Sequence, residues 1–259
     1  MDSEIKISLV MPTFNRGYCI QNAIASAMKQ RFGDWELIII DDGSTDNTER
    51  VVESFISNKI KYFKFPHTGL IPKIRNLGCQ KARGELIVVQ DSDDVSYPDR
   101  LERIWDFYQK NDFDVIYHDM YVRSFDPEHN AYLFELREAG EYDKNKLIER
   151  QYIPGQIAYK KSVWEKIPYN EEILMADDMM FLIELALNNC KFGYINRPLY
   201  EYNILEDSVN INAELDGRRL EDTKTMVKIL KEKYGIEAIG ELKQWEKQSG
   251  KVLKQQYVK

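Results

Sequence analysis

Short apolar runs alternate with amphipathic stretches over the first hundred residues of the chain. Four runs have the length and composition of buried strands, and the segments between them place apolar residues at helical spacing. The expected strands are Ile5–Met11, Glu36–Asp41, Ile60–Phe65 and Glu85–Gln90. The expected helices cover about residues 20–29, 45–57 and 71–83, and a further helix covers about 98–110. This order is typical of a parallel sheet wrapped by helices.

Aromatic-rich strands replace this pattern from about Asp114 onward. The expected elements are strands at Val115–Val122, Ala131–Leu136 and Ile157–Lys161, a helix at 177–189 and an extended stretch at Phe192–Tyr202. We interpret this part as a second lobe that completes one mixed sheet. The sequence therefore predicts an α/β domain at 1–213, made of two halves at 1–110 and 111–213, followed by a helical extension at 214–259.

The composition excludes several classes of protein. The 259 residues are 43% hydrophobic and 31% charged, with a mean hydropathy of -0.52, which is typical of an ordered soluble chain and not of a disordered or transmembrane one. The formal charge of -7 argues against general binding of nucleic acid, because clustered Lys and Arg hold phosphate backbones. Three cysteines without a short spacing indicate neither a disulfide framework nor a zinc cluster. Since no signal-peptide pattern precedes the first strand, we expect a cytoplasmic location.

The end of the chain is basic, although the protein as a whole is acidic. Residues 224–259 hold nine Lys and four Glu. One interpretation is a helical tail that contacts anionic lipid headgroups, at the inner face of a membrane. The alternative is a solvated helical face that packs back on the body. The sequence does not indicate the oligomeric state.

Three carboxylates follow the apolar strand around residues 86–89 within four positions: Asp91, Asp93 and Asp94. Because like charges repel, this arrangement at the carboxyl end of a buried strand favours a bound cation. Mg²⁺ or Mn²⁺ takes carboxylate oxygens together with phosphate oxygens, and open α/β sheets bind ligands at this edge. The sequence thus indicates a nucleotide diphosphate with a metal ion. The alternative is an acidic turn that caps the following helix.

Two further turns follow strands that should end at the same edge. Asp41 and Asp42 come at the end of the second strand, where they can hydrogen-bond a nucleobase or ribose. Pro12 ends the first strand, and Phe14 can stack on a base. Each turn alone is a common strand ending. Together, the three turns converge on one crevice and supply what a nucleotide requires.

The order and spacing of these motifs resemble the family 2 glycosyltransferases of the GT-A fold. The matching motifs are Pro12-Thr-Phe-Asn15, Asp41-Asp-Gly-Ser-Thr-Asp46, Ile74-Arg-Asn-Leu-Gly78 and Asp91-Ser-Asp-Asp94 with Pro98-Asp-Arg-Leu101. The resemblance covers residues 5 to about 105 well and continues weakly to about 205. It implies a Rossmann-like GT-A sheet and a nucleotide-diphospho-sugar donor. A UDP-sugar is the first candidate for this donor. It also implies a Mn²⁺ or Mg²⁺ cofactor and inverting transfer to a glycan or lipid-linked acceptor, in surface polysaccharide or glycoconjugate synthesis. On this resemblance, residues 1–110 form the donor half of the domain and residues 111–213 form the acceptor half.

Six positions match the donor-binding residues of that family. They are Pro12, Phe14 and Asp42 for the nucleoside, Arg75 near the diphosphate, and Asp91 and Asp93 for the Asp-x-Asp motif. In that motif the second aspartate usually meets the metal, which assigns Asp93 as the metal ligand, and the first lies near the ribose.

Inverting displacement also requires a base on the opposite face of the sugar. Asp177-Asp178 lies where the family has a Glu-Asp pair at the start of a helix, so the resemblance makes Asp178 the catalytic base. Asp177 in place of Glu is a departure from the family pattern. The alternative is that the paired acids simply favour the helix N-terminus.

A second departure concerns the metal. Family members often supply a late histidine, but none follows His129 here, which leaves Asn203, Glu206 and Asp207 as substitutes. His67 is expected to be an exposed loop residue. From position alone, we expect the segment Gly155-Gln156 and Tyr159 on the acceptor side.

Other functions lack their sequence signals. A nucleotidyltransferase should show an early glycine-rich phosphate loop, and neither a dinucleotide fingerprint nor a Walker loop occurs in the chain. The alternative from another class is a catalytically silent GT-A binding module or partner subunit. The missing histidine and Asp177 are the features that favour it.

Overall fold

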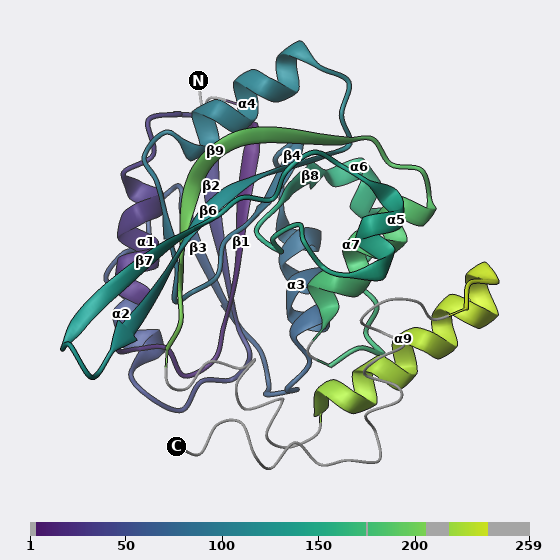
Figure 1. The fold of residues 1–259 in the computed structure, drawn as a ribbon. Helices are drawn as coiled ribbons and strands as arrows, with labels where there is room; N and C mark the ends of the chain where they lie inside the picture. Colours follow the sequence, from purple (N-terminus) through teal and green to yellow (C-terminus); the bar gives the residue numbers. More distant parts are fainter. Residues whose placement is uncertain (1–3, 175, 206–217, 238–259) are drawn as a thin grey trace.

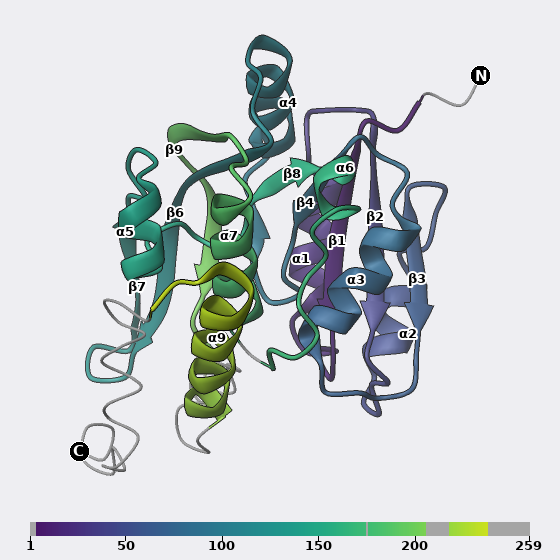
Figure 2. The same cartoon turned by 90° about the vertical axis from the view of Figure 1, so that its right-hand side faces the viewer.

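The fold is a mixed β-sheet with helices on both faces (Figures 1 and 2). The structure is a computed structural model, and it describes residues 4–174, 176–205 and 218–237. The described strands follow the order β3-β2-β1-β4-β8-β6-β9-β5, and β7 pairs with β6 beside this path. The predicted α/β class with one mixed sheet is confirmed.

The first half of the chain supplies the parallel part of the sheet. β1 lies between β2 and β4, and β3 lies on the far side of β2. The bounds are β1 Ile7–Thr13, β2 Trp35–Asp41, β3 Ile60–Lys64 and β4 Leu86–Val89, with crossover helices α1 Ile20–Met28, α2 Thr48–Glu53 and α3 Ile71–Lys81. Because these strands are parallel, the turns after β1, β2 and β4 lie at one edge of the sheet.

The second half adds antiparallel pairs. β8 pairs with both β4 and β6 and so joins the two halves, β9 runs parallel to β6, and β5 pairs with β9. The strands are β5 Val95–Ser96, β6 Val115–Asp126, β7 Ala131–Arg137, β8 Ala158–Lys160 and β9 Phe192–Asn203. The helices are α4 Arg100–Lys110, α5 Lys144–Glu149, α6 Lys161–Trp164, α7 Asp177–Leu187 and α9 Arg218–Tyr234.

Two apolar clusters fill the space between the sheet and its helices. Successive strand residues point to opposite faces, so Leu9 joins one cluster and Val10 joins the other. The Leu9 cluster contains residues of α1, α2 and α4, and the Val10 cluster contains residues of α3, α5, α6 and α7. The strands are therefore buried on both faces, which explains their continuous apolar runs.

The structure differs from the prediction at three places. β1 extends through Pro12 to Thr13, because β4 pairs with β1 only up to Val10 and no ladder bond is lost at the proline on that side. α2 is shorter than the predicted 45–57 helix. β5, α5 and α6 were not predicted, because segments of two to six residues are too short to show a period.

The described part of the basic tail packs back on the body. Met226 and Leu230 of α9 are buried in a third apolar cluster with Met180 and Ile183 of α7. Residues 238–259 of the predicted tail lie outside the described residues. None of the described helices combines the length and the apolarity needed to cross a bilayer.

Candidate active site at the carboxyl ends of the strands

Arg75 on α3 connects the acidic loop after β4 with the start of α7. Its Nη2 donates to Oδ1 of Asp91 at 3.0 Å, and its Nε donates to Oδ2 of Asp177 at 2.9 Å. Burial raises the pKa of Asp177 to about 7, and the Arg75 charge opposes this shift. Nη1 of Arg75 is buried and has no hydrogen-bond partner in the described part of the chain. The two N–H groups on Nη1 of this cation therefore remain for a ligand.

Asp93 and Asp94 complete the acidic loop. Oδ2 of Asp93 lies 3.6 Å from Nε of Arg16. Oδ1 of Asp94 accepts from the N–H of Asn203 at 2.8 Å, whereas its buried Oδ2 has no partner among the described residues. Burial, and then the charges of Asp93 and Asp91, raise the pKa of Asp94 well above its usual range. A cation bound beside this loop would relieve the repulsion.

The turns after β1 and β2 meet through a loop before α3. Asp42 accepts from the N–H groups of Thr68 and Gly69 at 2.7 and 2.8 Å, and Nδ1 of His67 lies 2.9 Å from its Oδ2. The His67 ring also stacks on Phe14, with ring centroids 4.2 Å apart. Phe14 and Asp42 thus lie together as predicted. His67 is an exposed loop residue, as expected, and it also contacts Asp42 and Phe14.

Asp178 lies in the first turn of α7, and its carboxylate is held from two sides. Nε2 of Gln151 donates to Oδ2 at 2.8 Å, and the N–H of Met179 donates to Oδ1 at 2.7 Å. Gly155 lies against the same carboxylate, since a Cβ at this position would be 2.5 Å from Oδ2. The loop between α5 and β8 therefore fixes where this carboxylate points.

We expect Gly155→Ala to lower activity without abolishing nucleotide binding. The added methyl group displaces Asp178, and a misplaced group of this kind costs about 10- to 100-fold in rate. Gly33→Ala is the matched control, because no atom lies within 4 Å of a Cβ built there. The measurement is the turnover rate of both variants at saturating donor. Equal rates for the two variants would contradict the placement of Asp178.

A buried arginine supports the acidic loop from the side of α4. Arg100 donates to four groups: the carbonyls of Val89 and Gln156, the Ser96 hydroxyl and Nε2 of His118. Gln156 in turn donates from Nε2 to Oδ2 of Asp91 at 2.8 Å. Because His118 accepts at Nε2 and its Nδ1 lies 2.8 Å from the Asp119 carbonyl, its ring is neutral with the proton on Nδ1.

This arrangement predicts acid sensitivity. Burial, and then the charge of Arg100, lowers the pKa of His118 to about 3, whereas an unfolded histidine has a pKa of about 6.5. The unfolded state therefore binds a proton that the folded state excludes, and the free energy of unfolding falls by up to about 1.4 kcal/mol per pH unit from this group between those values. Urea unfolding at a series of pH values checks this. We expect His118→Gln to flatten the profile. His129→Gln removes an exposed contact with Asp126 and should change the profile far less.

Of the three residues expected on the acceptor side, the structure places two near the candidate site and one in the core. Gly155 and Gln156 contact Asp178 and Asp91, but the expectation for Tyr159 was wrong. Tyr159 is buried in the apolar cluster of α3 and α7, because the strand alternation of β8 turns it to that face. Gln151 was missed, and a single polar residue in a loop gives no sequence signal.

The late metal contact is only partly described. Asn203 reaches the acidic loop, where its Nδ2 donates to the Asp93 carbonyl at 2.8 Å, while its Oδ1 accepts from Arg123. Its side chain therefore supports the loop, and its acceptor atom already accepts a hydrogen bond from a cation. Glu206 and Asp207 lie outside the described residues.

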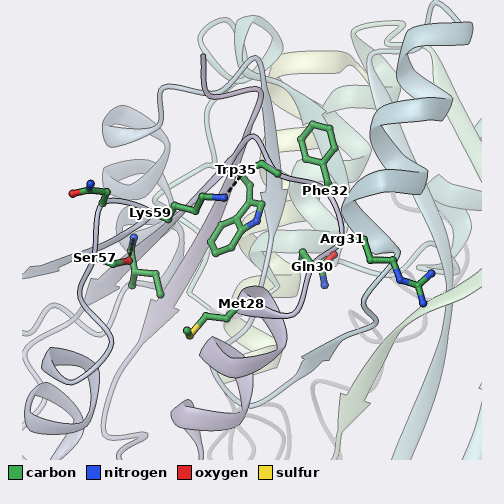
Figure 3. A pocket seen from close by; sticks show the side chains of 10 residues that line it. Met28, Gln30, Arg31, Phe32, Trp35, Ser57 and Lys59 are labelled. Atoms are coloured by element: carbon green, nitrogen blue, oxygen red, sulfur yellow. Dashed lines mark hydrogen bonds between the residues drawn. The ribbon is translucent and has the colours of Figure 1, made fainter. Parts of the chain in front are cut away.

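A hollow of about 490 Å³ lies at the opposite end of the parallel strands. Figure 3 shows Trp35 and Lys59 on its wall, where Nζ of Lys59 lies 4.9 Å from the centroid of the Trp35 ring. Trp35 begins β2, so this hollow lies at the amino ends of the strands. None of the predicted site residues lines it.

The mixed sheet, with acidic turns at the carboxyl ends of its parallel strands, defines a glycosyltransferase of the GT-A class. Residues 8–178 match the family described as Glycosyl transferase family 2, and the chain belongs to this family.

Individual relatives and solved structures agree with this assignment. The poly(ribitol-phosphate) β-N-acetylglucosaminyltransferase TarP of Staphylococcus aureus is 29% identical over 77% of this chain and 62% of its own length. The structure of S. aureus TarS 1–349 in complex with UDP-GlcNAc has a TM-score of 0.69, at 22% identity over 88% of this chain and 67% of that chain. The mannosyltransferase PcManGT of Pyrobaculum calidifontis, in complex with GDP-Man and Mn²⁺, has a TM-score of 0.62, at 14% identity over 86% of this chain and 63% of that chain. The two structural similarities show the fold.

Proposed function

We propose that the protein transfers a sugar from a UDP-sugar to a hydroxyl group of a glycan or lipid-linked acceptor, with inversion at the anomeric carbon. The observation that carries the proposal is the convergence of Arg75, Asp91 and the Asp177-Asp178 pair, which joins the donor half to the acceptor half at one edge of the sheet. TarP and the TarS complex, both connected by name with N-acetylglucosamine, favour UDP as the donor nucleotide.

In this proposal the nucleoside lies over the turns after β1 and β2. Phe14 supplies an aromatic face for the base, beside Pro12, and Asp42 lies next to it. The diphosphate lies near the buried Nη1 of Arg75, whose two N–H groups have no other described partner. Asp91 lies near the ribose, held in place by Arg75 and Gln156.

The acidic loop fits a divalent metal. Asp93 and Asp94 supply carboxylate oxygens, which are the ligands that Mg²⁺ and Mn²⁺ prefer. The buried Oδ2 of Asp94 has no hydrogen-bond partner among the described residues, and a bound cation would supply one interaction for it. The described residues contain no group of three acidic, histidine or cysteine side chains that could bind a metal without further ligands. Mg²⁺ and Mn²⁺ sites of this kind take their remaining ligands from phosphates. Bound to Asp93, the metal would neutralise charge on the leaving diphosphate.

Asp178 is the proposed base. Gln151 and the N–H of Met179 orient its carboxylate so that it can accept the proton of the acceptor hydroxyl while the new glycosidic bond forms. Asp178 stands at the start of α7, directly after Asp177. Because Asp177 binds Arg75 and Arg75 also binds Asp91, the start of α7 lies close to the acidic loop.

The experiment is a donor screen with product analysis. The purified chain is incubated with Mn²⁺ and a panel of UDP-, dTDP- and GDP-sugars, and nucleotide release is measured with and without candidate oligosaccharides. We expect release of UDP and an inverted anomeric configuration in the product. Nucleotide binding without release from any donor would favour the catalytically silent module, and a product with retained configuration would contradict Asp178 as the base.

Contact of the basic tail with a membrane surface remains a prediction. Within the described residues, Lys233 of α9 is held by Glu184 of α7 at 2.8 Å. Binding of the full chain to vesicles with and without anionic lipid tests it.

A further inference from the structure

The β6–β7 hairpin has an unpaired edge and two exposed apolar faces. Within residues 4–174, 176–205 and 218–237, β7 pairs only with β6, so its other edge has no strand beside it. All seven residues of β7 are exposed. Figures 1 and 2 show the hairpin extending away from the helices that cover the rest of the sheet. Such an edge presents unpaired backbone N–H and C=O groups that fit another β-strand.

Most side chains of the exposed strand β7 are apolar. It contains no proline and no lysine, and its exposed residues include Tyr132, Leu133, Phe134 and Leu136, each 44–56% exposed. The register places Phe125 and Tyr132 opposite each other on one face, where their rings lie 5.4 Å apart. An apolar cluster of this kind on an exposed edge marks an interaction surface.

Two charges of β7 make the edge complementary to itself. Glu135 and Arg137 are two residues apart, so they point to the same face on either side of Leu136. In an antiparallel pair of two β7 strands centred on Leu136, Glu135 of each chain lies opposite Arg137 of the other. The two Leu136 side chains then meet on the twofold axis, with Phe134 of each chain diagonal to them on the same face.

We propose that the protein forms a twofold symmetric dimer in which the β7 strands of two copies pair in antiparallel fashion, centred on Leu136. The pairing joins the two sheets into one and covers the apolar residues of both hairpins. The interface is isologous, as in most soluble homodimers. This proposal does not depend on the sugar-transfer reaction.

Analytical ultracentrifugation of the full chain, from micromolar to submillimolar concentration, tests the dimer. We expect a reversible monomer–dimer equilibrium. Leu136→Lys places two like charges on the axis and should leave only monomer. Because this side chain is exposed, the circular dichroism should be unchanged, and so should thermal unfolding at concentrations where the parent is also monomeric. Glu53→Arg, at an exposed position of α2, is the control and should dimerise like the parent. A parent that stays monomeric, or a dimer that Leu136→Lys does not weaken, would overturn the proposal.

A charge exchange tests the register separately. Glu135→Arg and Arg137→Glu each place like charges opposite each other twice, and each should weaken the dimer by about tenfold or more. The double variant Glu135→Arg/Arg137→Glu restores both opposite-charge pairs and should recover the parent affinity. A double variant as weak as the single variants contradicts the register. Cross-linking of β7 to residues 238–259 of the same chain would identify the tail as the occupant and also overturn the proposal.

Discussion

Asp178→Asn is expected to lower the rate of sugar transfer by about 10²- to 10⁴-fold, because asparagine cannot accept the proton of the acceptor hydroxyl. The amide is nearly the same size as the carboxylate, so α7 and its packing should remain intact. Its oxygen can still accept one of the hydrogen bonds that Asp178 receives from Gln151 and Met179. The affinity for UDP should change little, since the proposed base contacts the acceptor and not the nucleotide.

Single-turnover kinetics with a saturating donor separate these effects. The matched control is Asp143→Asn, which removes a carboxylate that caps the short helix α5 and accepts its hydrogen bonds from the N–H groups of Asn145 and Lys146. We expect the control to retain the parent rate. If Asp178→Asn transfers sugar at the rate of the control, the proton must go elsewhere and the assignment of the base is wrong.

Arg75→Met is expected to lower the free energy of unfolding by about 3 kcal/mol or more at alkaline pH, because removal of one member of a buried ion pair leaves ionised carboxylates without a partner. Arg75 contacts both Asp91 and Asp177, and Asp177 is only 4% exposed. The variant should also bind UDP more weakly, since it loses the buried cation near the proposed diphosphate position. Urea unfolding and nucleotide titration measure the two effects.

The pH dependence of this loss has a definite sign. In the parent, the pKa of Asp177 is about 7. Without Arg75 this pKa is higher, because the burial remains and the positive charge that opposes it is gone. A carboxyl group with a raised folded pKa supplies stability at low pH and loses it as the pH increases. The difference between Arg75→Met and the parent should therefore be larger at alkaline than at acidic pH. In Arg75→Met/Asp177→Asn, most of this pH dependence should disappear, and its persistence would show that Asp177 does not cause it.

Strands and helices with a periodic apolar pattern could be predicted from the sequence. Elements that depend on a few contacts between distant segments could not. The strands around Leu9 and Ile39 were predicted because burial on both faces produces an apolar run in the sequence itself. The short β8 was also predicted, but its antiparallel pairing with both β4 and β6 depends on contacts between distant segments. β5, with two residues, left no pattern at all.

The candidate site shows the same division. Asp91, Asp93 and Asp178 stand beside recognisable strand and helix boundaries, so their positions were predictable. Arg100 supports the loop through four hydrogen bonds, and Gln151 orients Asp178. Most hydrogen-bond partners of these two residues lie far away in the sequence, and nothing in the local sequence around Arg100 or Gln151 indicates them.

Calorimetric titration with UDP, with and without Mn²⁺, for the parent chain and for Asp93→Asn tests the central claim most directly. Asparagine keeps the size of the side chain and removes the charge that the metal requires. The account predicts that the parent binds UDP tightly only with Mn²⁺ and that Asp93→Asn loses the effect of the metal. It also predicts that Mn²⁺ alone binds weakly, because the part of the chain that the structure describes holds no complete ligand set. Binding of UDP that is equally strong in the variant, or independent of Mn²⁺, would contradict a metal-assisted donor site at the acidic loop.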